Sequence, residues 1–164
     1  MKMPVYFVSH GGGPWPWISE WDAMYAKLHE SLVQMPAQLP QRPKAILMVS
    51  AHWISRDELQ VMTNPQPGMF YDYYGFPEHT YKVEYSAPGS PALAQEVREL
   101  LEKQGFKVSE DAERGFDHGA FVPLAVAFPD ADIPVVQLSI AKHYDPDYHI
   151  RMGQALASLR DQGD

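Results

Sequence analysis

Three short, continuous apolar runs are separated along the chain by longer segments with helical periodicity. The runs cover residues 5–8, 45–49 and 133–138, and each is rich in valine or isoleucine. An apolar run without polar alternation is typical of a strand that is covered on both faces. Strands that alternate with helices form α/β folds. We therefore predict an α/β three-layer sandwich, in which a central sheet, mostly parallel or mixed, is flanked by helices.

Four helices are predicted between and after these runs, at residues 19–33, 90–104, a short stretch from about 123, and 146–160. Their end signals are Ser19 and Asp145 as caps, Pro91 and Pro123 in first turns, and Gly105 as a stop. The periodicity places Met24 and Ile150 on buried helix faces. Weaker alternation predicts edge strands at 59–63 and 81–85.

Composition limits the partners of the chain. With 164 residues, 45% of them hydrophobic, residues 1–164 are expected to form a single domain. The net charge of -8 and the scattered basic residues argue against nucleic acid or an anionic membrane as a partner. There is neither a signal peptide nor a membrane-spanning apolar run, so a cytoplasmic protein is expected. Because cysteine is absent, any metal must be held by His, Asp or Glu.

Two histidines follow predicted strands. His10 comes after the first apolar run and His52 after the second, so both are expected at carboxyl ends of strands, where α/β folds bind ligands. Gly11 and Gly12 allow a tight turn that leaves space beside His10. Two imidazoles at one sheet edge could bind one ion. The alternative is that His10 caps a strand and His52 is a hydrogen-bonded core residue, and the pattern does not choose between them.

The stretch GFDHGAFVPL, residues 115–124, places Asp117 beside His118 just before the helix expected at Pro123. An imidazole held there suits acid and base catalysis. In the simpler alternative, Asp117 caps the turn and His118 is half exposed. A long aromatic loop, 64–81, could form the wall of a pocket for a flat ring, or could pack over the edge of the sheet.

Five motifs together, SHGGGP, VSAHW, YSAPGSPALA, GFDHGAFVPL and DADIPVVQLSI, resemble those of the LigB-type class III extradiol ring-cleavage dioxygenases, in particular the DOPA 4,5-dioxygenase branch. The resemblance implies one non-haem metal, usually Fe(II) although several members hold Zn(II), and a catechol-type or DOPA-like substrate with O2. It makes His10 and His52 two of three metal ligands and His118, with Asp117 beside it, the catalytic pair. Residues expected to line the substrate are Gly11, Gly12, Trp53 and Phe76.

Members of this family continue beyond the point where the present sequence stops. The resemblance implies a further strand, a late catalytic histidine and a third ligand, His or Glu, for which this chain has no counterpart. We therefore expect the chain to lack the C-terminal portion and to expose a strand edge that favours a homo-oligomer. The expected activity is extradiol ring cleavage. The alternatives are a non-catalytic metal-binding or ligand-binding homologue, a fragment of such an enzyme, or a metal-dependent hydrolase.

Overall fold

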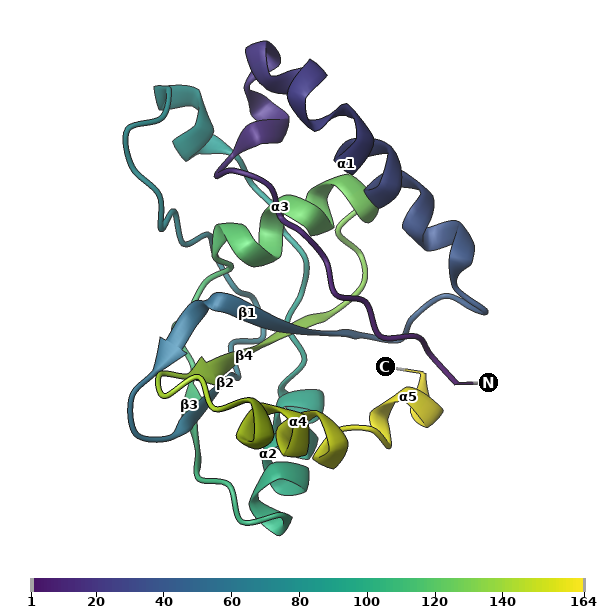
Figure 1. Cartoon of the computed structure of the whole chain (residues 1–164), viewed down its shortest axis with the longest axis vertical. Coiled ribbons are helices and arrows are strands. Elements are labelled where there is room, and N and C mark those ends of the chain that lie inside the picture. Colours follow the sequence, from purple (N-terminus) through teal and green to yellow (C-terminus); the bar gives the residue numbers. More distant parts are fainter. Residues whose placement is uncertain (1, 164) are drawn as a thin grey trace.

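The computed structural model describes residues 2–163, which form a mixed sheet with helices on both faces (Figure 1). The strands are β1 (Ile46–Ser55), β2 (Leu59–Met62), β3 (Val108–Asp111) and β4 (Val135–Ala141). They are ordered β1-β4-β2-β3. β1 runs parallel to β4 and β2 runs parallel to β3, while β2 and β4 are antiparallel. The predicted α/β sandwich with a mixed sheet is confirmed.

Helices cover the sheet in two layers (Figure 1). One layer holds α1 (Asp22–Gln34) and α3 (His118–Ala127), and the other holds α2 (Pro91–Lys103), α4 (Pro146–Ala155) and α5 (Leu159–Gln162). Short 3-10 turns are η1 (Trp15–Trp17), η2 (Ser19–Trp21), η3 (Met35–Gln38) and η4 (Glu78–Lys82). Among the residues described, no helix is both long and apolar enough to cross a membrane.

The strand β4 separates two apolar cores. Val135 packs in the core that contains Phe121 of α3, whereas Val136 and Leu138 pack in the core that contains Val97 of α2. Neighbouring positions of a strand point to opposite faces of the sheet. An apolar run without alternation therefore fits a strand that is covered on both sides. The strand predicted at 133–138 is confirmed, although β4 begins two residues later, at Val135, and continues to Ala141.

The second and fourth helices begin where the sequence predicted. The hydroxyl of Ser90 accepts a hydrogen bond from the backbone N–H of Leu93 at the start of α2. The carboxylate of Asp145 accepts one from the N–H of Asp147 at the start of α4. Gly105 follows α2 with a φ of +85°, a left-handed conformation that favours glycine. These ends are set by local side chains, which is why the sequence predicts them.

Two predicted strands are wrong and one strand was missed. Residues 5–8 form no ladder, and Val5 and Phe7 are exposed, because apolar composition cannot supply the neighbouring strand that backbone pairing needs. Residues 81–85 lie partly in η4 and partly in coil without a ladder. The missed strand, β3, carries Ser109 and Glu110 and lies at the sheet edge, where little apolar pattern is required.

Two helices differ from prediction in their ends and faces. Ser19 begins a 3-10 turn and its hydroxyl bonds to Glu20, while α1 begins later, at Asp22. Met24 and Ile150, both expected to be buried, are exposed. The helix expected at 146–160 is divided, since α4 ends at Ala155 and α5 begins at Leu159. Helical periodicity alone does not show where a neighbouring layer stops covering a face.

Candidate functional site

Three histidines from distant parts of the chain meet at one edge of the sheet. They are His10 in the N-terminal loop, His52 in β1 and His118 at the start of α3, and one ring nitrogen from each lies within 4.8 Å of the others. The Nε2 atoms of His10 and His52 are 2.9 Å apart. Two nitrogens bound to one ion at about 2.1 Å and about 90° apart would be separated by about 3.0 Å. The donor set and its spacing therefore fit a single metal ion.

His52 projects from an irregular part of β1. The ladder with β4 pairs Val49 with Leu138 and then Ile54 with Ile140, so residues 50–53 lie opposite Ser139 alone. Such a bulge redirects side chains at functional sites. The position of His52 is therefore inside β1 rather than at its end, which corrects the sequence prediction. His52 is also exposed, so the alternative of a hydrogen-bonded core residue is wrong.

His10 is held by a loop that wraps around a buried tryptophan. The indole Nε1 of Trp15 donates a hydrogen bond to the carbonyl oxygen of His10 over 2.9 Å. Gly11 has a φ of +73°, and a Cβ there would lie 2.5 Å from the Trp15 ring. Only glycine meets both conditions. No strand precedes His10, so neither its predicted place at a strand end nor the alternative of a strand cap holds.

His118 is the first residue of α3, because Asp117 caps this helix. The Asp117 carboxylate accepts a hydrogen bond from the N–H of Ala120. The helix thus begins five residues before Pro123, and the predicted start at Pro123 is wrong; this proline lies inside the helix. His118 is only 8% exposed, so the half-exposed alternative is also wrong. The capping alternative for Asp117 is confirmed.

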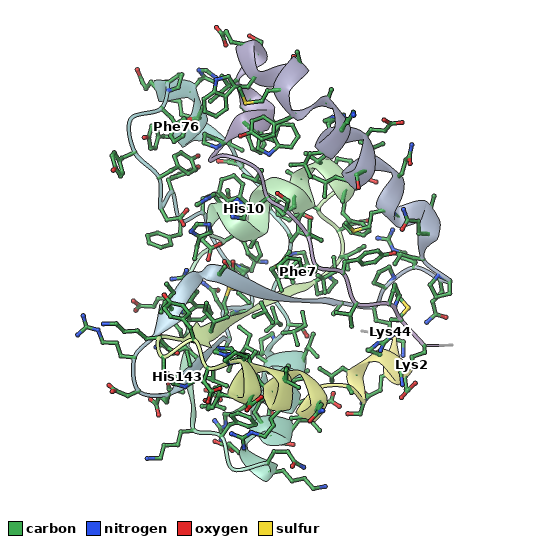
Figure 2. All side chains as sticks on the ribbon, in the orientation of Figure 1. Lys2, Phe7, His10, Lys44, Phe76 and His143 are labelled. Atoms are coloured by element: carbon green, nitrogen blue, oxygen red, sulfur yellow. The ribbon has the colours of Figure 1, made fainter. Side chains whose placement is uncertain are left out.

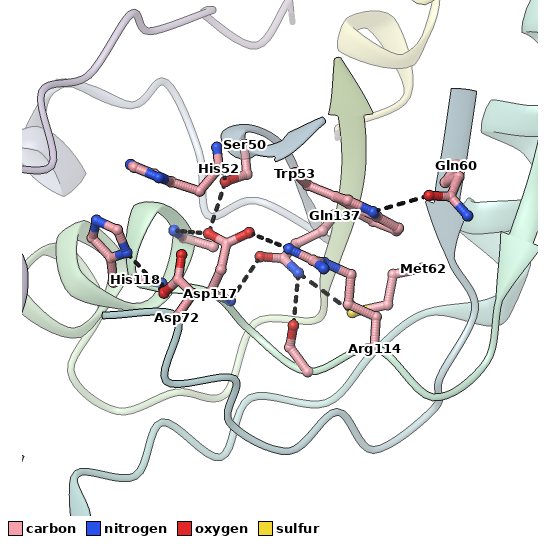
Figure 3. Close-up of polar contacts among 12 residues, drawn as sticks. Ser50, His52, Trp53, Gln60, Met62, Asp72, Arg114, Asp117, His118 and Gln137 are labelled. Atoms are coloured by element: carbon pink, nitrogen blue, oxygen red, sulfur yellow. Dashed lines mark hydrogen bonds and ion pairs between the residues drawn. The ribbon is translucent and has the colours of Figure 1, made fainter. Parts of the chain in front are cut away.

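One carboxylate joins the segments that carry His52 and His118 (Figure 3). Asp117 Oδ1 accepts a hydrogen bond from the hydroxyl of Ser50 over 2.7 Å, and that hydroxyl accepts one from the N–H of His52 over 3.2 Å. Asp117 Oδ2 forms an ion pair with Arg114 over 2.8 Å. Because Asp117 is fully buried, its contacts are with protein groups, and its position suits orientation of the two histidines.

A second carboxylate, Asp72, holds His118 directly (Figure 3). Its Oδ1 accepts a hydrogen bond from the backbone N–H of His118 over 3.0 Å and lies 2.8 Å from the ring Nδ1. Burial would raise the pKa of Asp72, but the hydrogen bonds from His118 outweigh it and the pKa lies below its ordinary value of 3.8. Asp72 is therefore ionised at neutral pH.

The environment keeps the two proposed ligand rings neutral. Burial lowers the pKa of His10 below its ordinary value of 6.5, and the repulsion that His118 and His52 would exert when protonated lowers it further. Burial followed by the charge on His118 has the same effect on the pKa of His52. Neutral imidazole is the form that binds metal ions, so both rings are ready to do so near pH 7.

Aromatic rings form a layer beside the histidines. The ring centroid of Tyr73 lies 5.9 Å from that of His118 and 5.4 Å from that of Phe76. Burial raises the pKa of Tyr73 to about 12, and its hydroxyl donates a hydrogen bond to the carbonyl oxygen of Thr80. Figure 2 shows Phe76 near the outer end of this layer. The aromatic loop therefore packs over the core and also supplies a ring next to His118.

The remaining predicted substrate residues have mainly internal contacts. A Cβ on Gly11 would meet the Trp15 ring, and one on Gly12 would lie 2.5 Å from the Tyr25 hydroxyl, so these glycines accommodate protein groups. Trp53 is buried, donates to Gln60 and lies 4.2 Å from the Arg114 guanidinium carbon. These are contacts of core residues. Substrate binding by them stays a prediction.

Sequence reasoning missed four residues of this site. They are Ser50, Asp72, Arg114 and Gly119. The three-residue spacing of Arg114 and Asp117 was a local signal for an ion pair. A Cβ on Gly119 would lie 2.8 Å from His52 Cδ2, a contact that depends on the tertiary fold. Asp72 stands 46 residues from His118, and nothing near it in the sequence indicates its partner.

The other four histidines lie outside the cluster. His29 and His79 are exposed, and His79 Nε2 lies 2.7 Å from the carbonyl oxygen of Trp17. His143 accepts a hydrogen bond from the N–H of Asp145, and His149 accepts one from the N–H of Ala141. Figure 2 shows His143 near α4, far from His10. Among the described residues, these four side chains take no part in the histidine cluster.

Comparison with known proteins adds a consistent result. The profile of the catalytic LigB subunit of aromatic ring-opening dioxygenase matches residues 6–164. A 4,5-DOPA dioxygenase extradiol from Beta vulgaris is 50% identical over 124 residues, which cover 75% of this chain and 46% of that protein. Its counterpart from Escherichia coli (strain K12) is 42% identical over 162 residues, which cover 99% of this chain and 56% of that protein.

A solved structure is also similar. The crystal structure of an uncharacterised protein from Escherichia coli K12 superposes with a TM-score of 0.66 at 42% identity, over 83% of this chain and 49% of that chain. The present chain spans about half the length of the curated relatives that it matches. The family match over residues 6–164 includes His10, His52 and His118.

Proposed function

The chain belongs to the LigB family of catalytic subunits of aromatic ring-opening dioxygenases, and from this premise we propose that it carries part of a non-haem metal-dependent extradiol dioxygenase. The substrate would be a catechol-type or DOPA-like aromatic compound, and O2 would be the second substrate. The single observation that carries the proposal is the convergence of His10, His52 and His118 at one edge of the sheet.

His10 and His52 are the residues that would hold the ion. Their Nε2 atoms lie 2.9 Å apart, and their lowered pKa values favour the neutral imidazole form that binds metal ions near pH 7. Fe(II) is the metal we propose, because zinc has no redox chemistry to offer a ring cleavage by O2. When bound, such an ion would bring catecholate and O2 together and let electron density pass between them.

His118 would serve as the acid and base. Its ring centroid lies 4.0 Å from that of His52 and 4.9 Å from that of His10, close enough to exchange a proton with a substrate oxygen held between them. Tyr73 would limit the site on one side, since its ring meets that of His118 at 5.9 Å. Asp117 would act by positioning, through Ser50 and the first turn of α3.

The test is a reconstitution assay. Chain loaded with Fe(II) without air is mixed with catechol or DOPA and then exposed to O2, while O2 uptake and the yellow ring-opened product are recorded. His10→Gln and His52→Gln should abolish both signals. His29→Gln is the matched control, because His29 is exposed and lies outside the cluster, and it should retain wild-type behaviour. A longer protein, which also contains the region of its relatives that this chain does not match, is assayed in parallel.

The alternative functions predict different results in this assay. A non-catalytic metal-binding homologue would bind the ion without product in either the short or the longer protein. A metal-dependent hydrolase would remain active with Zn(II) and without O2. Ring-opened product that forms only with Fe(II), O2 and both histidines would support the dioxygenase. A cytoplasmic location stays a prediction from the sequence.

A further inference from the structure

We propose that Asp72 is a positioning residue that fixes the ring of His118 in the tautomer with hydrogen on Nδ1, leaving a bare Nε2 directed toward His10 and His52. The role in catalysis rests on the proposed function, whereas the tautomer itself does not. The proposal goes beyond the ligand set because Asp72 lies in the aromatic loop, 46 residues before His118, and contacts neither His10 nor His52 through a hydrogen bond.

One oxygen of Asp72 lies within hydrogen-bonding distance of two nitrogens of His118. The backbone N–H of His118 donates to Asp72 Oδ1 over 3.0 Å, and a backbone N–H can act only as a donor. Oδ1 is therefore an acceptor. The same oxygen lies 2.8 Å from Nδ1 of the His118 ring. An ionised carboxylate has no hydrogen to give, so Nδ1 must carry the hydrogen in this contact.

The consequence appears on the other side of the ring. A neutral imidazole has one N–H and one lone pair, so hydrogen on Nδ1 leaves Nε2 as the lone-pair atom. The His118 ring has Asp72 at its Nδ1 (Figure 3), and its centroid lies 4.0 Å from that of His52. A bare nitrogen there can accept a proton from a bound hydroxyl group. The opposite tautomer would present an N–H that could only donate.

Asp72 also fixes where the ring is placed. The hydrogen bond from the backbone N–H fixes the position of His118 at the start of α3, and the contact at Nδ1 restricts the rotation of its ring. Because both bonds end on one atom of a side chain that is itself half-buried, the ring has little freedom to turn. Carboxylates that orient a functional histidine through its second nitrogen typically affect activity or metal affinity by about 10–100-fold when they are removed.

The experiment reads the tautomer directly in the metal-free chain. Protein labelled with ¹⁵N is treated with a chelator at neutral pH, and a long-range ¹H–¹⁵N correlation spectrum separates protonated from bare ring nitrogens. Wild type should show hydrogen on Nδ1 and a bare Nε2 for His118, assigned by its loss in His118→Gln. Hydrogen on Nε2 in the wild type, either alone or together with hydrogen on Nδ1, would overturn the proposal, and this measurement requires no Asp72 variant to fold.

Two substitutions then identify the cause. Asp72→Ala removes the acceptor and should populate the tautomer with hydrogen on Nε2, whereas Asp72→Asn retains an acceptor oxygen and should keep the wild-type tautomer. Asp145→Ala is the matched control, because it removes a carboxylate that also accepts a backbone N–H at a helix start, here α4. The control should leave the His118 signals unchanged. A wild-type tautomer in folded Asp72→Ala would refute the positioning role.

Activity provides a separate readout. In the reconstitution assay Asp72→Ala should lower kcat by about 10–100-fold, with KM for the aromatic substrate nearly unchanged and Zn(II) binding retained. Asp72→Asn, which retains the acceptor oxygen, should restore most of kcat. If wild type gives the expected tautomer but no ring-opened product, the proposed function fails while the positioning of His118 stands.

Discussion

Ser50 of β1 donates a hydrogen bond over 2.7 Å to the buried carboxylate of Asp117, which follows 67 residues later in the chain. This bond links the two chain segments that carry His52 and His118. Ser50 precedes His52 by two residues, and Asp117 immediately precedes His118. Because Asp117 also caps α3 and pairs with Arg114, one side chain fixes both a strand and a helix at the edge where the cluster forms.

Replacement of Asp117 should therefore affect stability and metal binding together. Asp117→Ala leaves the Arg114 guanidinium without its partner in a site where the two side chains are 12% and 0% exposed. Loss of one member of a buried pair costs about 3–5 kcal/mol. Urea unfolding should show this loss, and titration calorimetry should show Zn(II) affinity reduced by about 10-fold or more.

Asp132→Ala is the control for that experiment. Asp132 pairs with Arg42 over 2.6 Å, but both side chains are more than half exposed, so little change in stability and none in Zn(II) affinity is expected. Wild-type Zn(II) affinity in folded Asp117→Ala would contradict the positioning role of this carboxylate.

Gly119→Ala should disturb His52 and the neighbouring hydrogen bond between Ser50 and Asp117. The new Cβ would lie 2.8 Å from His52 Cδ2 and 3.0 Å from the Ser50 hydroxyl, so the imidazole must move. We expect Zn(II) affinity to fall by about 10-fold. Gly153→Ala in α4 meets nothing within 4 Å and should raise stability by about 0.5–1 kcal/mol with unchanged affinity. Equal affinities in the two variants would argue against close packing of His52 on α3.

The metal-free chain should lose stability as the pH falls below 6.5. The pKa values of His10 and His52 are lowered in the folded state, so the unfolded chain binds protons at these rings first as the pH falls. Stability decreases wherever the unfolded state binds more protons. Urea unfolding at pH 7.5 and at pH 5.5 should show a smaller decrease for a His10→Gln, His52→Gln double variant. An identical decrease would mean that neither ring has a lowered pKa.

Self-association is expected through the exposed apolar side chains of the N-terminal segment. Val5 and Phe7 are exposed, and β1 is one of the two edge strands of the described sheet, with Val49 and Ile54 also exposed. Light scattering should detect a homo-oligomer whose population falls in Phe7→Ser. Tyr74→Ser, at another highly exposed aromatic position, in the loop 64–81, should leave association unchanged. A wild-type monomer at all concentrations would rule out association.

Features governed by neighbouring residues were predictable from the sequence. Ser90, Asp145 and Gly105 mark helix ends through bonds or backbone conformations within a few residues. The apolar run at 133–138 reports burial on both faces, which β4 has. The run at 5–8 has the same composition but no pairing partner, so composition alone could not distinguish a strand from an exposed extended segment.

The site was predictable only in part. His10, His52 and His118 could be named because each follows or precedes an abrupt change from an apolar run to glycine or polar residues. Their common location depends on the parallel pairing of β1 with β4 and on packing of α3 against β1. Asp72 and Ser50 act across 46 and 67 residues respectively. Such partners are fixed by tertiary structure and leave no periodic pattern.

In the bulge, β1 has more residues than the facing part of β4, and this difference has an evolutionary consequence. Since residues 50–53 face Ser139 alone, a homologue that lost one of them could still close the ladder at Ile54 and keep both cores. It would nevertheless rotate or shift His52 away from His10. The number of residues between these two ladder positions is therefore a simple criterion for sorting homologues into those that retain the ion-binding geometry and those that have only inherited the fold.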